Sequence, residues 1–364
     1  IKSLNEMSEL NLKLEKVREK LDQLKIEAIL ITHLPNIRYL TGFTGSSAIC
    51  IITKNEAFFI TDFRYKEQSK EQVKGFKRFI ATGKTLLDLI QEKNIFDKFK
   101  KIGVESQHIP LSFVLELKKK FRDVKFIPTK NFIEEISAVK THSEVEKIKF
   151  AIKISEKVFE EILNIIKPGI SELEIASEIT YLHRKFGAEK DAFDIIVASG
   201  WRSALPHGVA TDKKLKKGEL VVIDFGCVYD GYHSDITRTI SIGKAKPEAR
   251  KIYQIVLDAQ AKAIEKVGKG VKANELDSVA RNYIKQKGYG KFFGHSLGHG
   301  IGIEIHTLPR IAPKSNYILQ AGNVITIEPG IYIPGFGGVR IEDDILVDSN
   351  ASILTSLPRN LIEV

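Results

Sequence analysis

The chain is poor in cysteine and methionine and has no long apolar run. Its 364 residues include two cysteines and one methionine. Cys50 and Cys227 each lie in an apolar, strand-like segment, so we expect buried free thiols and no disulfide framework. No segment approaches the 18 or more apolar residues of a membrane span, and the opening IKSLNEMSEL lacks an apolar signal core. We therefore expect a cytoplasmic protein that does not act at a membrane.

A concentrated basic surface is also missing, although the net charge is +10. The 56 basic and 46 acidic residues are spread along the chain, with only small clusters at Lys118–Lys120 and Lys213–Lys217. Basic residues interleaved with aromatic residues, as in nucleic-acid tracks, are not found. The sequence thus argues against nucleic-acid binding. Scarce Met and Cys beside abundant Ile, Lys and Glu resemble the composition of heat-adapted proteins.

The length and the order of patterns predict two domains. Residues 1–137 combine an amphipathic helix at about 9–24 with short apolar strands, which indicates a small N-terminal α/β domain. Residues 138–364 alternate helix pairs with antiparallel strands, so the fold class is α+β.

Two helix starts in the larger domain carry the capping-box spacing of a serine followed three residues later by glutamate. Ser143 with Glu146 predicts the start of one helix, and Ser171 with Glu174 predicts the start of the next. The similar layout of KPGISELEIASEI and GKGVKANELDSVA suggests a weak internal duplication, with one hairpin in each half.

Five possible metal ligands follow one another in strand-like or turn segments of this domain. An acidic side chain inside an apolar strand is costly to bury unless a cation neutralises it. The segments VVIDFG, VITIEPGIYI and GGVRIEDDILV each place a carboxylate in such surroundings. Several buried like charges require a highly charged partner, and bound metal is the simplest. The ligand candidates are Asp224, Asp235, His299, Glu328 and Glu342.

The spacing of the carboxylates predicts two hairpins. A loop centred on Tyr229–Asp230 would place Asp224 directly opposite Asp235, and a Pro/Gly-rich turn centred on Gly335 would place Glu328 opposite Glu342. Two facing pairs and one imidazole suit two divalent ions, roughly 3.5–4 Å apart as in two-metal hydrolases. Oxygen-rich ligation with a single histidine favours Mn, Co or Zn.

Further histidines accompany these ligands. The glycine-rich segment FFGHSLGHGIGIEIHTLPR contains His295, His299 and His306, and glycines let a backbone pass close to a ligand. We expect an alternating IGIEI strand before His306. His207, in SALPHGVA, is by itself compatible with an ordinary loop histidine or with a catalytic one.

Taken together, the motifs PHG, IDFGCVYDGYHSDITRT, GHSLGHGIGIEIH, TIEPGIY and VRIEDD resemble those of the pita-bread metallopeptidases, the M24 family. This family includes aminopeptidase P, prolidase and methionine aminopeptidase. The match covers about residues 195–350, with every ligand position filled. The N-terminal segment NIRYLTGFTGSSAICIITKNEAFFITDFRYKEQ resembles the start of small bacterial Xaa-Pro peptidases, whereas methionine aminopeptidases generally lack such a domain.

The resemblance implies a role for each metal ligand. Asp224 would bind one of two divalent ions, Asp235 and Glu342 would bridge both, and His299 and Glu328 would hold the other. Glu328 would also act as general acid and base.

The resemblance also implies roles around the metals. His207 and His306 would hold the substrate and stabilise the tetrahedral intermediate, and His295 would line the proline pocket. Arg340 would brace the metal ligands. Arg310 matches an arginine that meets the free carboxylate of a dipeptide in prolidases, but a solvated loop arginine would look the same in sequence.

The function implied by the resemblance is a metal-dependent aminopeptidase that removes the first residue from peptides with proline second. A prolidase restricted to Xaa-Pro dipeptides is the nearest alternative, and Arg310 favours it. A non-catalytic binding module and a creatinase-like hydrolase without metals are more distant, because such relatives lose ligands. Members of the family usually form homodimers, so we expect one here.

Overall fold

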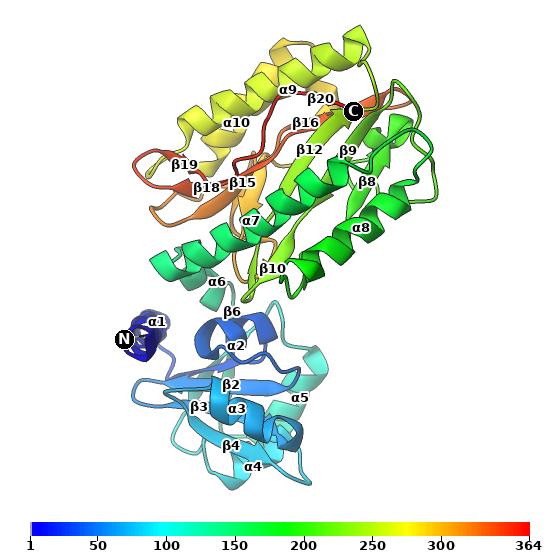
Figure 1. The fold of residues 1–364 in the computed structure, drawn as a ribbon. Helices are drawn as coiled ribbons and strands as arrows, with labels where there is room; N and C mark the ends of the chain where they lie inside the picture. The colour runs from blue at the N-terminus through cyan, green and yellow to red at the C-terminus, as the bar shows by residue number, and fades with distance from the viewer. Residues whose placement is uncertain (1) are drawn as a thin grey trace. The chain divides into compact units, whose positions relative to one another are not determined.

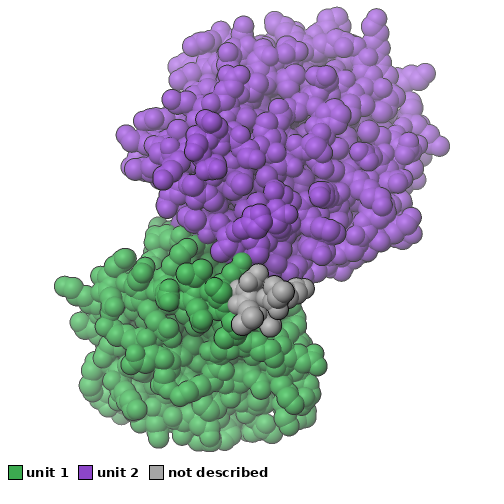
Figure 2. All heavy atoms as spheres, turned by 60° about the vertical axis from the view of Figure 1, so that its left-hand side comes forward, with its two compact units in different colours: residues 1–137 green, residues 138–364 purple. Residues whose placement is uncertain are grey.

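The computed structural model describes residues 2–364, with side chains described from residue 7 onward. It divides into two compact units, Ile1–Ser137 and Ala138–Val364, which are coloured separately in Figure 2. Within the described residues, no helix is long and apolar enough to cross a membrane. Cys50 and Cys227 are both free and buried, as the sequence predicts.

The N-terminal unit is built on a six-stranded mixed sheet, which confirms the predicted α/β class. The strand order is β4-β3-β2-β1-β5-β6, with β1, β5 and β6 mutually parallel and β2 antiparallel to its neighbours. Its strands are β1 Ala28–Ile31, β2 Ala48–Thr53, β3 Ala57–Asp62, β4 Lys77–Ala81, β5 Lys101–Glu105 and β6 Lys125–Thr129. Its helices are α1 Lys2–Leu24, α2 Leu34–Thr41, α3 Lys66–Gln72, α4 Leu86–Glu92, α5 Leu111–Lys120 and α6 Phe132–Ser137, with a 3-10 turn η1 at Phe63–Tyr65. The helix expected at about 9–24 is therefore the C-terminal part of the longer α1.

The C-terminal unit contains two helix pairs, α7 His142–Leu163 with α8 Glu172–Lys185, and α9 Pro247–Lys266 with α10 Ala273–Gln286. The capping box of α8 uses Ser171 and Glu174, as predicted. The predicted start of α7 is wrong by two residues, because Thr141 and Glu144 form its capping box in place of Ser143 and Glu146. Thr141 with Glu144 and Ser143 with Glu146 have the same spacing in the sequence, but only Thr141 lies at the N-cap position of α7.

Two larger sheets and two small ones complete this unit. The larger sheets have the orders β20-β12-β9-β8 and β14-β13-β15-β18-β19. The first half contributes β7 Lys190–Asp191, β8 Ile196–Ser199, the 3-10 turn η2 Gly200–Ala204, β9 Leu220–Phe225, β10 Cys227–Tyr229, β11 Tyr232–His233 and β12 Ile236–Ser241. The second half contributes η3 Gly290–Phe292, β13 Gly298–Gly300, β14 Thr307–Ile311, β15 Val324–Ile327, β16 Gly330–Ile333, β17 Gly337–Arg340, β18 Asp343–Val347, β19 Ala351–Ile353 and β20 Ile362–Glu363.

The helix pairs lie against these strands, the green α7 and α8 and the yellow α9 and α10 in Figure 1. Apolar side chains of α9 and α10, including Ile252, Val256 and Leu276, form one buried cluster with strand residues such as Ile325 and Ile345. This packing removes apolar surface from water and fixes the strands that carry the acidic residues. The predicted α+β class is confirmed.

Candidate metal centre

Asp224 and Asp235 belong to neighbouring strands, but they are not directly opposite. In the β9–β12 ladder Asp224 pairs with Thr237, and the hairpin turns at Asp230–Gly231, whose φ angles are 45° and 82°. Positive φ at both positions is the signature of a two-residue type I′ turn. The predicted centre at Tyr229–Asp230 is therefore wrong, and the pair is offset by two residues. Since side chains alternate with a period of two, an even offset leaves both aspartates on the same face.

The second carboxylate pair has the predicted register. In the β15–β18 ladder Ile327 pairs with Asp343, and in the β16–β17 ladder Gly330 pairs with Arg340. Both ladders place the turn at Gly335, which has a φ of 78°. Glu328 and Glu342 lie between the two ladders, at the position where this register sets them opposite each other.

Glycines on either side of His299 permit close backbone approach, as expected. A Cβ atom on Gly298 would lie 1.9 Å from the carbonyl oxygen of Thr326, and one on Gly300 would lie 2.1 Å from that of Leu308. Neither contact is sterically possible, so these positions require glycine. The tight packing brings β13 against both of its neighbours and sets the position of the imidazole.

The His299 ring presents one nitrogen to the acidic residues. Its Nδ1 lies 3.1 Å from the carbonyl oxygen of Gly300, and its Nε2 lies 3.4 Å from both Asp235 Oδ2 and Glu328 Oε1. When Nδ1 carries the proton and donates to the backbone, Nε2 has a free lone pair directed at the carboxylates. A second-sphere hydrogen bond of this kind is typical of metal-ligating histidines.

The acidic side chains have the properties of an ion-binding site. Ligand atoms of Asp235, His299 and Glu342 all lie within 4.8 Å of one another. Asp224 Oδ1 and Glu342 Oε1 are buried and have no hydrogen-bond partner among the described residues. Unsatisfied buried carboxylate oxygens are costly, and a divalent cation with oxygen and imidazole ligands would satisfy them. These residues therefore fit a metal site.

The electrostatics of the cluster support the same conclusion. Burial raises the pKa of Asp235 well above its usual value, and the negative charges of Asp224 and Glu328 raise it further. Burial and the charge of Asp235 likewise raise the pKa of Glu342 well above its usual value. Burial also raises the pKa of Glu328. Without a cation, these carboxyl groups would hold protons at a pH where free carboxyl groups are ionised.

Arg340 connects the two carboxylate pairs. Its Nη2 donates to Asp224 Oδ2 at 2.5 Å, and its Nε donates to Thr237 Oγ1 at 3.1 Å. The Thr237 hydroxyl in turn donates to Glu342 Oε2 at 2.6 Å. The sequence singled out Arg340 but not Thr237, which lies directly opposite Asp224 and is fully buried.

A second chain of hydrogen bonds runs from Arg340 to His295 through Tyr332. Arg340 Nη1 donates to the Tyr332 hydroxyl at 2.9 Å, and this oxygen lies 2.9 Å from His295 Nε2. Burial, followed by the positive charge of Arg340, lowers the pKa of His295 to about 4. The neutral ring can donate from Nδ1 to the Ser296 carbonyl at 2.8 Å, so that Nε2 accepts from Tyr332. Sequence reasoning missed Tyr332, although TIEPGIY contains it.

The remaining histidines have different settings. The His306 and His299 rings lie 4.4 Å apart between centroids, at 67°. Desolvation, followed by the charge of His299, lowers the pKa of His306 to about 4. The expected strand before His306 is not formed; residues 302–306 adopt bends that lead into β14. His207 is exposed on the loop after η2, next to Pro206, whose carbonyl accepts from Arg340 Nη1 at 3.1 Å.

Arg310 lies across a strand pair from the metal-ligand candidate His299. The two residues are direct partners in the β13–β14 ladder, and directly opposed side chains share one face of a sheet. Arg310 is exposed, so its guanidinium is accessible to a ligand on that face.

Asp343 is a buried acid that belongs to a different environment. It accepts from Arg238 Nη2 at 2.8 Å, Gln260 Nε2 at 3.0 Å and Arg359 Nε at 2.6 Å. Its carboxylate is therefore neutralised by protein cations. Its neighbour Asp344 is also buried, but Oδ1 of Asp344 has no hydrogen-bond partner.

Buried carboxylates around one histidine on an α+β scaffold are typical of metalloproteins with an oxygen-rich site. Residues 146–349 match metallopeptidase family M24, and residues 13–139 match the creatinase/prolidase N-terminal domain. The chain belongs to metallopeptidase family M24. The family resemblance seen in the motifs is thus confirmed.

Relatives that cover almost the whole chain agree with this assignment. An Xaa-Pro dipeptidase of Pyrococcus horikoshii is 42% identical over 98% of this chain and 100% of that protein. The solved structure of an Xaa-Pro dipeptidase from Bacillus anthracis has a TM-score of 0.94 at 43% identity, covering 98% of this chain and 100% of the other. An X-Pro aminopeptidase from Thermotoga maritima has a TM-score of 0.89 at 42% identity, covering 95% and 100%.

Proposed function

We propose that this metallopeptidase is a prolidase that hydrolyses Xaa-Pro dipeptides. The sequence alone favoured an aminopeptidase acting on longer peptides, but relatives named as Xaa-Pro dipeptidases cover almost the entire chain. The observation in this chain that carries the proposal is Arg310. An exposed guanidinium directly across the ladder from His299 is suited to bind the free carboxylate that a dipeptide presents beside the scissile bond.

The proposed site holds two divalent ions, of Mn, Co or Zn. Asp224, Asp235, His299, Glu328 and Glu342 would hold these ions. The unpartnered oxygens of Asp224 and Glu342 support this assignment. When bound, the ions supply Lewis acidity and lower the pKa of a water molecule.

Side chains of the protein then transfer the proton and bind the scissile carbonyl during hydrolysis. Glu328 accepts the proton of the attacking water and delivers it to the proline nitrogen as the C–N bond breaks. His306 and His207 hold the scissile carbonyl and stabilise the negative charge that develops on its oxygen.

Two further groups fix the geometry. His295, kept neutral, lines the pocket for the proline ring. Arg340 holds the ligands Asp224 and Glu342, the latter through Thr237. The free amine of the substrate is attracted by the surrounding carboxylates, which favours cleavage next to a peptide N-terminus.

The second candidate is an Xaa-Pro aminopeptidase, because the similar structure from Thermotoga maritima is named as one. Metal-stripped enzyme would be reloaded with Mn²⁺, Co²⁺ or Zn²⁺ and tested on an Xaa-Pro dipeptide, an Xaa-Pro-Yaa tripeptide and a dipeptide without proline. A prolidase cleaves the first and leaves the other two intact. Cleavage of the tripeptide at a similar rate would establish the aminopeptidase.

Arg310→Ala tests the carboxylate contact. Loss of a charge-assisted contact worth about 1.5–3 kcal/mol would raise KM for the dipeptide by about 10- to 100-fold. Arg250→Ala is the control, since this arginine is also partly exposed but pairs with Glu363. An unchanged KM in Arg310→Ala would remove the argument for a dipeptide carboxylate at this position.

We also propose that the protein is cytoplasmic and forms a homodimer. Light scattering after size exclusion would test the oligomeric state.

A further inference from the structure

The loop that carries His207 is tied to the N-terminus of α8 by a single buried carboxylate. Glu172, the first residue of α8, is fully buried. Its Oε1 accepts from the backbone N–H and the hydroxyl of Ser199, both at 2.8 Å. Its Oε2 accepts from the backbone N–H and the hydroxyl of Thr211, at 3.1 and 2.9 Å. One side chain thus joins the two ends of the segment 199–211.

Cations and backbone groups complete this connection. Arg202 Nε donates to Glu172 Oε2 at 3.0 Å, while its Nη2 donates to the Val209 carbonyl at 2.6 Å. Lys213 Nζ donates to the Ser199 hydroxyl at 2.7 Å. The backbone N–H of Glu172 donates to the Lys213 carbonyl at 3.0 Å. At this helix start the free backbone N–H groups of Glu172 and Leu173 are thus satisfied by the carbonyls of Lys213 and Thr211.

The loop is also held from the side of the metal centre. The carbonyl of Pro206, directly before His207, accepts from Arg340 Nη1, and Arg340 itself holds Asp224. The loop that carries His207 is therefore held at Pro206 by Arg340, which also holds Asp224, and at Ser199 and Thr211 by Glu172. Within the part of the chain that the structure describes, the hydrogen bonds of the Glu172 carboxylate all end in the segment 199–211, so its effect on the site must pass through this loop.

A comparable arrangement holds His295 from α10. Asp277 is fully buried and accepts from Arg281 Nε at 2.7 Å and from the backbone N–H of Leu297 at 3.0 Å. Arg281 donates to the carbonyl of His295 at 2.8 Å. In each helix pair, the second helix thus supplies a buried carboxylate that pairs with an arginine beside a histidine of the proposed site. The arginine is Arg202 of η2 in the first case and Arg281 of α10 itself in the second.

We propose that Glu172 is a positioning residue that holds His207 in the geometry needed for hydrolysis. This inference rests on the proposed function of the site. Displacing a group that contacts the reacting carbonyl by about 1 Å can cost about 100-fold in rate. Removing the carboxylate should therefore slow catalysis without altering the metal ligands.

The first variant is Glu172→Gln, which keeps the shape but replaces one accepting oxygen with a donor. We expect kcat/KM for the Xaa-Pro dipeptide to fall by about 10- to 100-fold, with an unchanged metal content by elemental analysis. In a His207→Ala background the same change should cost less than about twofold, because residues acting as one unit are not additive. An equal loss in both backgrounds would overturn the proposal, since Glu172 would then act independently of His207.

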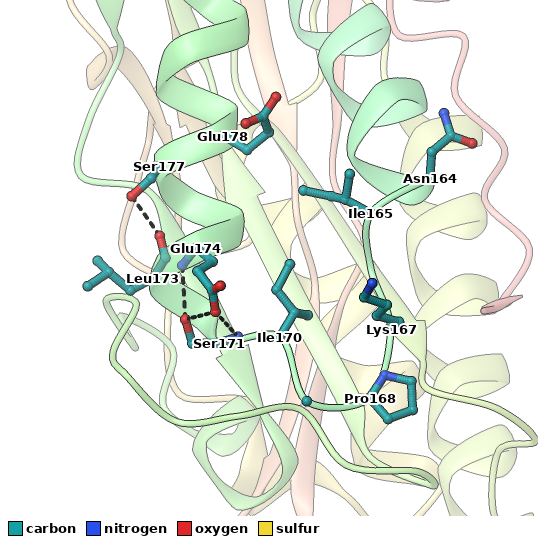
Figure 3. Close-up of a pocket in the computed structure, with 11 residues that line it drawn as sticks. Asn164, Ile165, Lys167, Pro168, Ile170, Ser171, Leu173, Glu174, Ser177 and Glu178 are labelled. Atoms are coloured by element: carbon teal, nitrogen blue, oxygen red, sulfur yellow. Dashed lines mark hydrogen bonds between the residues drawn. The ribbon is translucent and has the colours of Figure 1, made fainter.

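Glu174 supplies the matched control on the same helix. Its carboxylate accepts from the backbone N–H and hydroxyl of Ser171, at 2.8 and 2.6 Å, as Figure 3 shows. This capping box faces the open groove drawn there, and Glu174 makes no hydrogen bond to the His207 loop among the described residues. Glutamine can still close a capping box, so Glu174→Gln should leave kcat/KM nearly unchanged. A loss equal to that of Glu172→Gln would assign the effect to helix stability.

The single tryptophan of the chain gives a readout that does not depend on activity. Trp201 lies in η2, within the loop, and is 55% exposed. Glu172→Gln should lower its fluorescence anisotropy and increase quenching by acrylamide, whereas Glu174→Gln should change neither. If the wild-type enzyme cleaved no Xaa-Pro peptide, the proposed function would fail, but this measurement would still decide whether Glu172 holds the loop. Unchanged anisotropy in Glu172→Gln would overturn the proposal.

A milder variant covers the case in which Glu172→Gln does not fold. Thr211→Val keeps the branched side chain and removes the hydroxyl that donates to Glu172 Oε2. We expect the same direction in anisotropy and in kcat/KM, with an effect of about threefold to tenfold, the value of one hydrogen bond. A folded Thr211→Val enzyme with wild-type anisotropy and kcat/KM would contradict a role for this connection.

Discussion

Replacing Asp235 with asparagine should make the metal-free protein more stable while abolishing its activity. Asp235 is 5% exposed and lies among other acids, and burial and neighbouring charges raise its pKa. Above the usual carboxyl pKa of about 4, ionising this group therefore destabilises the folded chain relative to the unfolded one. Asparagine removes the charge with little change in shape.

The magnitude follows from the geometry of the cluster. At the 4.8 Å limit between ligand atoms of Asp235 and Glu342, two full negative charges repel by about 3.5 kcal/mol at an effective dielectric constant of about 20. Proton uptake relieves part of this repulsion, so we expect a net gain of about 2 kcal/mol at pH 8. For a domain of this size, that gain raises Tm by about 4–8 °C.

The assay is thermal unfolding of chelator-treated protein, followed by circular dichroism, with and without added Mn²⁺. Asp343→Asn is the matched control, because Asp343 is equally buried but paired with Arg238 and Arg359. Breaking a buried ion pair should lower the unfolding free energy by about 3–5 kcal/mol. A lower Tm for metal-free Asp235→Asn would refute the reasoning that this acid is uncompensated by the protein.

Three further outcomes are expected. Carboxyl groups with raised pKa retain protons in the folded metal-free chain that the unfolded chain releases, so the unfolding free energy of the metal-free protein should fall as pH rises above about 4. Because metal binding requires deprotonation, the Tm difference between Mn²⁺-loaded and metal-free protein should widen from pH 5.5 to pH 8. A constant difference would be contrary to the assigned pKa shifts. His306→Ala should lower kcat by about 100-fold or more with little change in KM, and an effect on KM alone in steady-state kinetics would count against transition-state stabilisation. Tyr332→Phe, which removes the link between Arg340 and His295, should lower the unfolding free energy by about 1 kcal/mol and raise KM for proline substrates, whereas wild-type values in urea unfolding and kinetics would show that the link is dispensable.

Local sequence rules account well for the second hairpin and less well for the first. A turn centred on the Pro/Gly-rich segment at Gly335 predicts that Glu328 and Glu342 are paired across the hairpin, and the observed ladders have that register. In the first hairpin the Asp230–Gly231 dipeptide was present in the sequence, but the loop was centred one residue too early. A type I′ turn needs positive φ at both central residues, which an Asp-Gly pair provides and Tyr229 does not. The two-residue offset places Thr237 instead of Asp235 opposite Asp224, but both aspartates still lie on the same face of the sheet.

The residues that sequence reasoning missed act through partners far along the chain. Tyr332 matters because Arg340 and His295 converge on its hydroxyl, and Glu172 matters because residues 27 and 39 positions later converge on its carboxylate. Neither convergence has a local signature, since an acidic residue at the first turn of a helix is commonplace. The alternating pattern before His306 also did not become a strand, since residues 302–306 form bends and β14 begins at Thr307.

The double ladder around Glu328 and Glu342 separates these proposed metal ligands from the tip of their hairpin. The inner ladder, β15 with β18, is by itself sufficient to keep the two glutamates opposite each other. Insertions or deletions in the turn at residues 334–336 would alter only the outer ladder, β16 with β17. Loop length at this tip can therefore diverge during evolution while the spacing of the two glutamates is inherited unchanged.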